Sequence, residues 1–485
     1  MLTEDIKKHL KKVRDGIYEI PTTFRPDMRV PARVFANEEI LNDIYEDRSL
    51  EQLVNVATLP GIVKQAMAMP DIHQGYGFPI GGVAATDINN KGVISPGGIG
   101  YDICCSVRLL ASNKSIDEVE EKLEDIASAI SRAIPSGMGR GGKTILSLEE
   151  LDKILKNGAK ELVAQGYGTE RDLEFCESNG CMPNAKPENI SDRAKERGKD
   201  QLGTLGSGNH FLEVQVVEEV FDEEAAKTFG LYKGQVVIMI HTGSRGLGHQ
   251  TCTDYVRKMV PMIKEWGIKL PDRELACAPF ESDLGQAYYH AMAAAANFSW
   301  ANKHMIAHNI RREWHYYFGE NAPLNLVYDV AHNIGKVEKH IVDGKKKTLL
   351  VHRKGATRAF PAHHPEIPRA YKEVGQPVFV PGTMGTASYV LVGTEEGMEL
   401  TFGSSCHGAG RRLSRKAAKK KVQGPDLRKQ LEEKGIIVRC TSNAELAEEA
   451  PIAYKDIENV IDVITSANLA KKVVRLRPRA VVKGD

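Results

Sequence analysis

The sequence of 485 residues sets 65 Lys and Arg against 64 Asp and Glu, for a net charge of +1, and 42% of its residues are hydrophobic. This balance is typical of a folded globular protein and excludes fibrous, disordered and strongly basic chains. It contains no run of the roughly 18 apolar residues that a membrane span needs, and too few Cys for a disulfide scaffold, so a reduced, cytoplasmic protein without membrane association is expected.

The first half of the chain mixes helical stretches with Gly-rich segments. Acidic and basic helical stretches are predicted for residues 1–50, together with a Pro-rich segment, PTTFRPDMRVPARVF. From Leu59 to Leu110, short β-branched runs such as GGVAAT and KGVIS predict strands, and Gly, Pro, Asp and His predict tight loops between them. Asp71 and His73 are assigned to such a polar loop. Helices are then predicted over 115–134, 148–165 and 191–200, with a loop at 135–143.

The second half repeats a pattern of apolar strand followed by polar loop. The run VVIMI predicts a buried strand, with HTGSRGLG as the loop that leaves it, and LNLVYDVAHNIG (324–335) has the same pattern. Ala-rich residues 284–318 predict a helix, strands and loops alternate over 348–408, and a basic helical region follows over 411–433. Because the polar motifs spread from about residue 71 to 410, one large domain must fold back to gather them.

Acidic, thiol and imidazole side chains stand next to Gly, Asn or Thr at predicted strand ends. Asp102 and Cys105 lie three residues apart, and His210, His241 and His332 occur in separate motifs. Such donors suit a first-row divalent metal, and one thiolate can bridge two ions. Each residue could equally be a hydrogen-bonded structural residue, and the spacing alone leaves both readings open.

Gly-rich loops with hydroxyl and amide side chains, GTLGSGNH, PGTMGTAS and CHGAGRR, can bring backbone N–H groups close to phosphate oxygens, although none is a Walker A loop. In the last of them, the imidazole of His407 could attack phosphorus, with Arg411, Arg412 and Arg415 stabilising the charge. Alternatively, His407 starts a helix with a solvated basic face.

Further basic residues predict an RNA-backbone groove. Its members would be Arg245, Arg353, Lys354, Arg358 and the segment 411–421.

The motifs in their order resemble the RtcB family of RNA-splicing ligases. They are MPDIHQGYGFPIGG, GYDICC, GSGNHFLEV, HTGSRGLGH, AHNIG, HRKGATRAF, PGTMGTASYVLVG, SSCHGAGR and the terminal VVKG. The resemblance implies one large α+β domain over 1–485, with mixed β-sheets around a central metal and nucleotide cleft and with peripheral helices. It would comprise an N-terminal segment (1–58), a motif-bearing core (59–410), and a basic helix and tail (411–485) that closes the nucleotide site.

The resemblance also implies the site residues. Two manganese ions would be bound, one by Asp102, Cys105 and His210, the other by Cys105, His241 and His332. His407 would be the nucleophile that carries GMP. Contacts to the guanine nucleotide would come from Asn209, His210, Phe211, Glu213, His332, Asn333, Gly382, Thr383, Met384, Ser388, His407, Gly408, Ala409, Gly410, Tyr454 and Lys483. The chain departs from the family's usual DINCG, because it reads DICCS and so places Cys104 beside the predicted ligand.

The activity implied is a GTP- and manganese-dependent RNA ligation, in which 2′,3′-cyclic phosphate or 3′-phosphate ends join 5′-hydroxyl ends through a histidine–GMP intermediate. It would act on RNA such as tRNA halves, in tRNA splicing and RNA repair, with archease as a candidate activating partner. A binuclear metal-dependent RNA phosphoesterase is the alternative, since it would use the same ligands without a nucleotide. Asp71 and His73 would either orient the RNA end or only form a turn.

Overall fold

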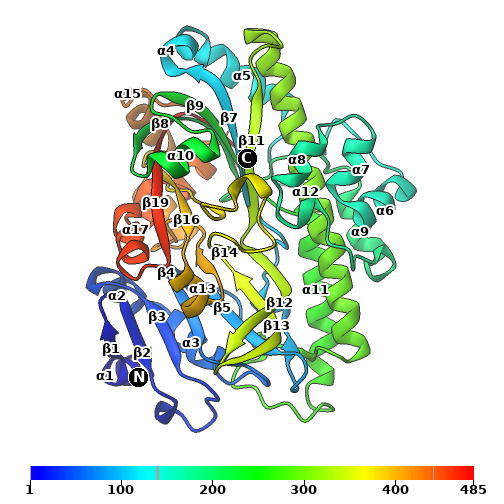
Figure 1. The fold of residues 1–485 in the computed structure, drawn as a ribbon, viewed down its shortest axis with the longest axis vertical. Helices are drawn as coiled ribbons and strands as arrows, with labels where there is room; N and C mark the ends of the chain where they lie inside the picture. The colour runs from blue at the N-terminus through cyan, green and yellow to red at the C-terminus, as the bar shows by residue number, and fades with distance from the viewer. Residues whose placement is uncertain (1, 138–140, 441, 485) are drawn as a thin grey trace.

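Two large mixed sheets form the centre of the protein in a computed structural model that describes residues 2–137, 141–440 and 442–484. In Figure 1 one sheet occupies the lower half of the molecule and the other the upper half. The lower sheet contains, in spatial order, β1 (Lys11–Arg14), β2 (Ile17–Ile20), β3 (Ala32–Phe35), β4 (Ala66–His73), β5 (Ile80–Asp87), β13 (Lys345–Lys354) and β12 (Asn333–Val342).

The upper sheet combines strands that lie between Ser106 and Lys483 in the sequence. In spatial order these are β11 (Leu324–Ala331), β7 (Ser106–Ser115), β9 (Gln235–Thr242), β8 (Phe211–Val220), β19 (Ala470–Lys483), β16 (Ser388–Gly393) and β15 (Pro377–Val380), with β18 (Ile437–Arg439) beside β19. The C-terminal strand is therefore central to this sheet. Two short pairs, β6 (Val93–Ile94) with β10 (Ala278–Pro279) and β14 (Ala356–Arg358) with β17 (Ser404–Cys406), complete the described strands.

Helices cover the outside of the sheets. The longest, α12 (Asp283–Phe318), begins where the Ser282 side chain accepts from the Gly285 N–H, and its Ala-rich middle is buried. It runs beside α11 (Arg245–Met262), with the shorter α6–α9 packed near them (Figure 1). The remaining bounds are α1 (Leu2–His9), α2 (Glu38–Ile44), α3 (Ser49–Val56), α4 (Ile116–Val119), α5 (Leu123–Ala133), α6 (Leu148–Asn157), α7 (Ala159–Ala164), α8 (Glu170–Glu174), α9 (Asp192–Gly198), α10 (Glu223–Phe229), α13 (Glu395–Thr401), α14 (Arg415–Lys421), α15 (Gly424–Glu433), α16 (Asn443–Glu448) and α17 (Ile457–Ser466). Within the described ranges, no helix is both long and apolar enough to cross a bilayer.

This arrangement confirms the predicted α+β class in one large domain, together with the helices near 115–134, 191–200 and 284–318. The helix predicted over 148–165 is interrupted at Gly158, whose φ of 61° ends α6. Part of the predicted loop 135–143 lies outside the described residues.

Several segments predicted as loops or helices are strands, and one loop is a helix. Residues 1–50 contain β1–β3 as well as helices, because these short strands extend the sheet edge beyond β4. Asp71 and His73 belong to β4, and only His332 separates β11 from β12. The loop predicted for HTGSRGLG is short, since α11 already begins at Arg245.

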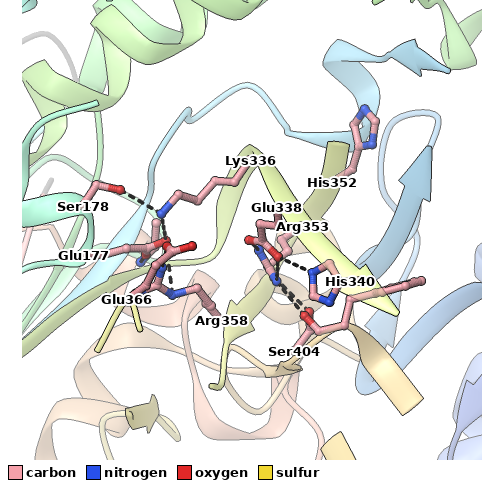
Figure 2. Close-up of polar contacts among 12 residues, drawn as sticks. Glu177, Ser178, Lys336, Glu338, His340, His352, Arg353, Arg358, Glu366 and Ser404 are labelled. Carbon is pink, nitrogen blue, oxygen red and sulfur yellow. Dashed lines mark hydrogen bonds and ion pairs between the residues drawn. The ribbon is translucent and has the colours of Figure 1, made fainter. Parts of the chain in front are cut away.

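Arginines predicted for an RNA groove lie in the interior instead. The side chain of Arg353 is fully buried in β13, where its guanidinium contacts Glu338 at 2.6 and 3.0 Å and donates to Ser404 Oγ at 2.9 Å. Arg358 in β14 is buried beside Glu366, and Lys336 pairs with Glu177 (Figure 2). The groove prediction is therefore wrong for Arg353 and Arg358, because a buried arginine must be paired.

Candidate active site

The ends of four neighbouring strands meet at one edge of the upper sheet. From β11 through β7 and β9 to β8, Ala331 pairs with Ser106, Ser106 with Thr242, and His241 with Phe211. Antiparallel pairing at these positions brings residues that are far apart in the sequence to the same edge. Polar side chains at any of these strand ends consequently face a shared space.

All five predicted metal ligands gather at this edge. Asp102 and Cys105 lie in the turn before β7, His210 directly precedes β8, His241 belongs to β9, and His332 follows β11. The ligand atoms form two groups, Asp102–Cys105–His210 and Cys105–His241–His332, and within each group the atoms lie within 4.8 Å of one another. Cys105 is shared by both groups, as a bridging thiolate would be.

The closest contacts join nitrogen and sulfur atoms that all carry lone pairs. Cys105 Sγ lies 3.4 Å from His210 Nε2 and 3.2 Å from His241 Nε2, and His241 Nε2 lies 3.2 Å from His332 Nε2. Two imidazole nitrogens that face each other at this distance repel unless a proton or a cation lies between them. The donor set of one thiolate, one carboxylate and three imidazoles fits first-row divalent ions.

Protonation equilibria in this cluster agree with that fit. Burial lowers the pKa of His241 and His332 well below the usual value, so both rings are neutral and can donate a lone pair. Desolvation alone would raise the pKa of Asp102, but His210 outweighs it and holds the pKa at about 2. Burial raises the pKa of Cys105, so this thiol needs a bound cation to ionise at neutral pH.

His407 lies beside this cluster, directly after β17 and well before the next helix. Its ring centroid is 4.8 Å from that of His332. Asp71, fully buried in β4, accepts from the His407 backbone N–H at 3.0 Å and from Nδ1 at 2.5 Å. Because Nδ1 is committed to the carboxylate, the lone pair of Nε2 is available for chemistry.

A glycine leaves room for the His407 ring. Gly355 has a φ of 62°, and a Cβ there would lie 2.3 Å from Ile80 Cγ2 and 3.2 Å from His407 Cε1. Any other residue would be strained in this backbone conformation and would also crowd the ring. Glycine is therefore required at position 355 of the motif RKGAT for steric reasons.

A pocket of about 980 Å³ opens over the cluster and His407. Of the residues predicted to contact the nucleotide, its lining includes Asn209, His210, Phe211, Glu213, His332, Asn333, Gly382, Thr383, Met384, His407, Gly408, Ala409, Gly410, Tyr454 and Lys483. Ser388 lies behind the lining, where its hydroxyl accepts from the Gly382 N–H at 3.2 Å and from Gln215 at 3.1 Å. It supports the Gly382 loop at the pocket, and its direct contact to a nucleotide stays a prediction.

The C-terminal strand supplies one wall of the pocket. Lys483 lies at the end of β19 opposite Phe211, and its ammonium donates to the carbonyl of Gly208 at 2.8 Å. Glu449, which is buried, contacts Tyr454 and lies 3.1 Å from Arg411. In the basic segment after His407, Arg411 is therefore paired with Glu449 at the pocket. The helix α14 begins only at Arg415, so His407 does not start it.

The sequence reasoning missed two features of the site: the pairing of Asp71 with His407, since Asp71 was considered only for orienting an RNA end or forming a turn, and any role for Glu449. A carboxylate within the apolar run AMAMPDIH was a usable signal, because a strand that buries an aspartate needs a partner for it. Glu449 carries no such signal, since its neighbours are ordinary helical residues.

His407 lies beside a ligand cluster that shares Cys105, and a pocket large enough for a nucleotide opens over both. This site, on a fold of mixed sheets, defines a candidate metal-dependent enzyme. Residues 52–484 match the family described as tRNA-splicing ligase RtcB, and the chain belongs to this family. It is 55% identical over 480 residues to a tRNA-splicing ligase RtcB of Thermococcus kodakarensis, with 98% of each chain covered. A relative of the same description from Archaeoglobus fulgidus is 53% identical over 478 residues, covering 98% of this chain and 99% of its own. An RNA-splicing ligase RtcB of Mycobacterium tuberculosis is 52% identical over 435 residues, which cover 89% of this chain and all of that relative.

Proposed function

We propose that the chain is an RNA ligase of tRNA splicing and RNA repair that uses GTP and two manganese ions to join 3′-phosphate or 2′,3′-cyclic phosphate ends to 5′-hydroxyl ends. The observation that carries the proposal is the position of His407. Its Nδ1 is bonded to Asp71, its ring is next to His332, and the pocket above it is large enough for a nucleotide.

His407 begins the reaction as nucleophile. Its Nε2 attacks the α-phosphorus of GTP, a P–N bond forms, and the P–O bond to pyrophosphate breaks. The proton on Nδ1 remains on the Asp71 hydrogen bond, so the carboxylate balances the positive charge of the ring. Manganese held by Asp102, Cys105, His210, His241 and His332 would supply Lewis-acid stabilisation of phosphate charge.

Two transfers complete the ligation. An oxygen of the RNA 3′-phosphate attacks the histidine-bound phosphorus, which breaks the P–N bond and leaves an RNA 3′-end activated by GMP. The 5′-hydroxyl of the second RNA then attacks the activated 3′-phosphorus, GMP leaves, and the hydroxyl proton passes to solvent. A cyclic phosphate end is first opened by water to the 3′-phosphate.

The test of this proposal is the intact mass of the protein after incubation with GTP and manganese. We expect a mass increase of one GMP that peptide mapping localises to His407, and no increase in His407→Ala. His9→Ala, at an exposed position of α1, is the matched control and keeps the adduct. With paired RNA ends present, a shortened product without any adduct would instead identify a metal-dependent RNA phosphoesterase.

The two neighbouring cysteines are expected to differ sharply in metal binding. Cys105→Ala removes the ligand common to both groups, so manganese binding measured by calorimetric titration should be lost while circular dichroism shows the fold retained. Cys104 lies in neither group and packs in an apolar cluster, so Cys104→Ala should bind manganese almost normally. Loss of binding in Cys104→Ala alone would reassign the ligand.

Glu213 makes nucleotide binding dependent on pH. Burial raises the pKa of its carboxyl to about 7, against the opposing effects of Gln215 and Lys483. The ionised carboxylate can accept two hydrogen bonds from a guanine edge, whereas the protonated form cannot. GTP affinity should therefore fall about tenfold between pH 8 and pH 6, as expected for one proton on a group of this pKa.

Titrating GTP calorimetrically into Glu213→Gln at the same two pH values provides the control. This variant should bind weakly and show a flat profile, because its amide does not titrate. An unchanged slope in the variant would assign the pH dependence to another group.

A further inference from the structure

The pocket extends beyond the residues predicted to contact the guanine nucleotide. Its volume of about 980 Å³ lies at the upper end of the roughly 300–1,000 Å³ of small-molecule sites. Besides the nucleotide set, the predicted ligand His241 and His73, the lining contains three aromatic rings, Tyr76, Tyr101 and His249, which we name the aromatic wall. The proposed ligation as described gives no role to these rings.

The aromatic wall combines residues from three segments. Tyr76 lies in the loop between β4 and β5, Tyr101 directly precedes Asp102, and His249 lies on α11. The ring centroids of Tyr76 and Tyr101 are 5.4 Å apart at an angle of 68°, and those of Tyr101 and His249 are 5.0 Å apart at 30°. Because Tyr101 adjoins a candidate metal ligand, the wall begins within one residue of the ligand cluster.

The loop that bears Tyr76 is held in place before any ligand binds. The Gly75 N–H donates to Gln52 Oε1 at 3.0 Å, and the Gly77 N–H donates to Glu274 Oε2 at 3.0 Å. The buried ammonium of Lys354 donates to the carbonyl of Tyr76 at 2.5 Å. A preformed wall loses little conformational entropy on binding, which favours affinity.

The rings present uncharged surface. Burial and the neighbouring Arg197 lower the pKa of His249, so its imidazole is neutral at pH 7, as the tyrosine hydroxyls are. Tyr76 and Tyr101 are only half-buried, Tyr101 against an apolar core cluster, and His249 is exposed, so all three rings still line the pocket. Uncharged aromatic faces suit a planar base, and every nucleobase can stack on them.

We propose that the aromatic wall stacks the terminal base of an RNA end whose reacting phosphate or hydroxyl lies at the ligand cluster. The inference rests on the proposed ligase function, which supplies RNA as the substrate. Both RNA ends carry a terminal base, so the ligand chemistry is a nucleobase, and the experiment distinguishes the 3′-phosphate end from the 5′-hydroxyl end.

The test measures binding of short fluorescent RNAs by anisotropy in the presence of manganese. One RNA carries a 3′-phosphate end and another a 5′-hydroxyl end, each with either a normal or an abasic terminal nucleotide. For the end that occupies the wall, removing the base should weaken binding to the unaltered protein about 5- to 150-fold, the usual effect of one base stacked on an aromatic side chain. The double variant Tyr76→Leu/His249→Ala removes two of the three rings and should lose most of this base dependence.

Two control variants separate stacking from general damage. His249→Phe keeps an aromatic face and should preserve the base dependence, and Tyr316→Ala, whose ring on α12 is 82% exposed outside the pocket, should bind as the unaltered protein does. The inference is overturned if neither RNA end shows base dependence, or if the double variant retains it in full. The GMP adduct reports separately on the ligase function, so base-dependent binding without an adduct would reject that function and leave the stacking site standing.

Discussion

Asp71→Asn is expected to slow formation of the GMP adduct on His407 by about 10²- to 10⁴-fold, the range found when an oriented acid–base partner is lost. In the structure one carboxylate oxygen of Asp71 accepts from both the backbone N–H and Nδ1 of His407. An asparagine amide can turn its NH₂ group toward the ring, which moves the imidazole proton to Nε2. The nucleophilic lone pair is then lost although the shape of the site is kept.

The measurement is single-turnover labelling with radioactive GTP, followed over a range of pH. A role limited to structure would lower thermal stability and leave the pH profile unchanged, whereas an effect on the tautomer changes the profile at constant GTP affinity. Asp87→Asn is the matched control, because Asp87 is also a buried strand aspartate but pairs with Lys347 away from the pocket. Full-rate labelling of Asp71→Asn would remove Asp71 from the chemistry.

The elements that the sequence predicted well are those specified by local interactions. The helix α12 has a capping serine before it and a glycine after it, and β9 contains the uninterrupted apolar run VVIMI. The candidate metal ligands could also be picked out from the sequence. Histidines at strand ends beside Gly or Asn are seldom needed for the local structure itself. What the sequence could not provide was the pairing that brings these strand ends together.

Long-range partners explain the errors. β1 is exposed along its length and highly charged, so nothing in its own composition indicates a strand. Arg353 looks like a surface residue because arginine is rarely buried without a partner, and that partner, Glu338, becomes visible only when β12 pairs with β13. Asp71 was assigned to a loop for the same reason, since its partner His407 is 336 residues away.

Glu338→Gln is expected to lower the free energy of unfolding by about 3–5 kcal/mol, the usual loss when one member of a buried ion pair is removed. Arg353 is fully buried against Glu338 and also donates to Ser404 Oγ (Figure 2). A further hydrogen bond runs from its guanidinium to the carbonyl of Phe402. Burial alone would raise the pKa of Glu338, but the charge of Arg353 holds it well below the usual range. The carboxylate therefore stabilises the fold above about pH 4, the ordinary pKa of glutamate, and this contribution is lost as the pH falls further.

Urea unfolding at pH 7 measures the loss, and Glu219→Gln, at a half-exposed ion pair with Arg475, should unfold almost as the unaltered protein does. The double variant Glu338→Met/Arg353→Met removes both charges and should regain most of the lost stability, because no unpaired charge stays buried. β17 leads directly into His407, and its first residue, Ser404, accepts a hydrogen bond from Arg353. The double variant lacks this hydrogen bond, so it should still label slowly with GTP although its stability is regained. If labelling recovers together with stability, the ion pair supports only the fold, and the position of His407 depends on Asp71 and Gly355 alone.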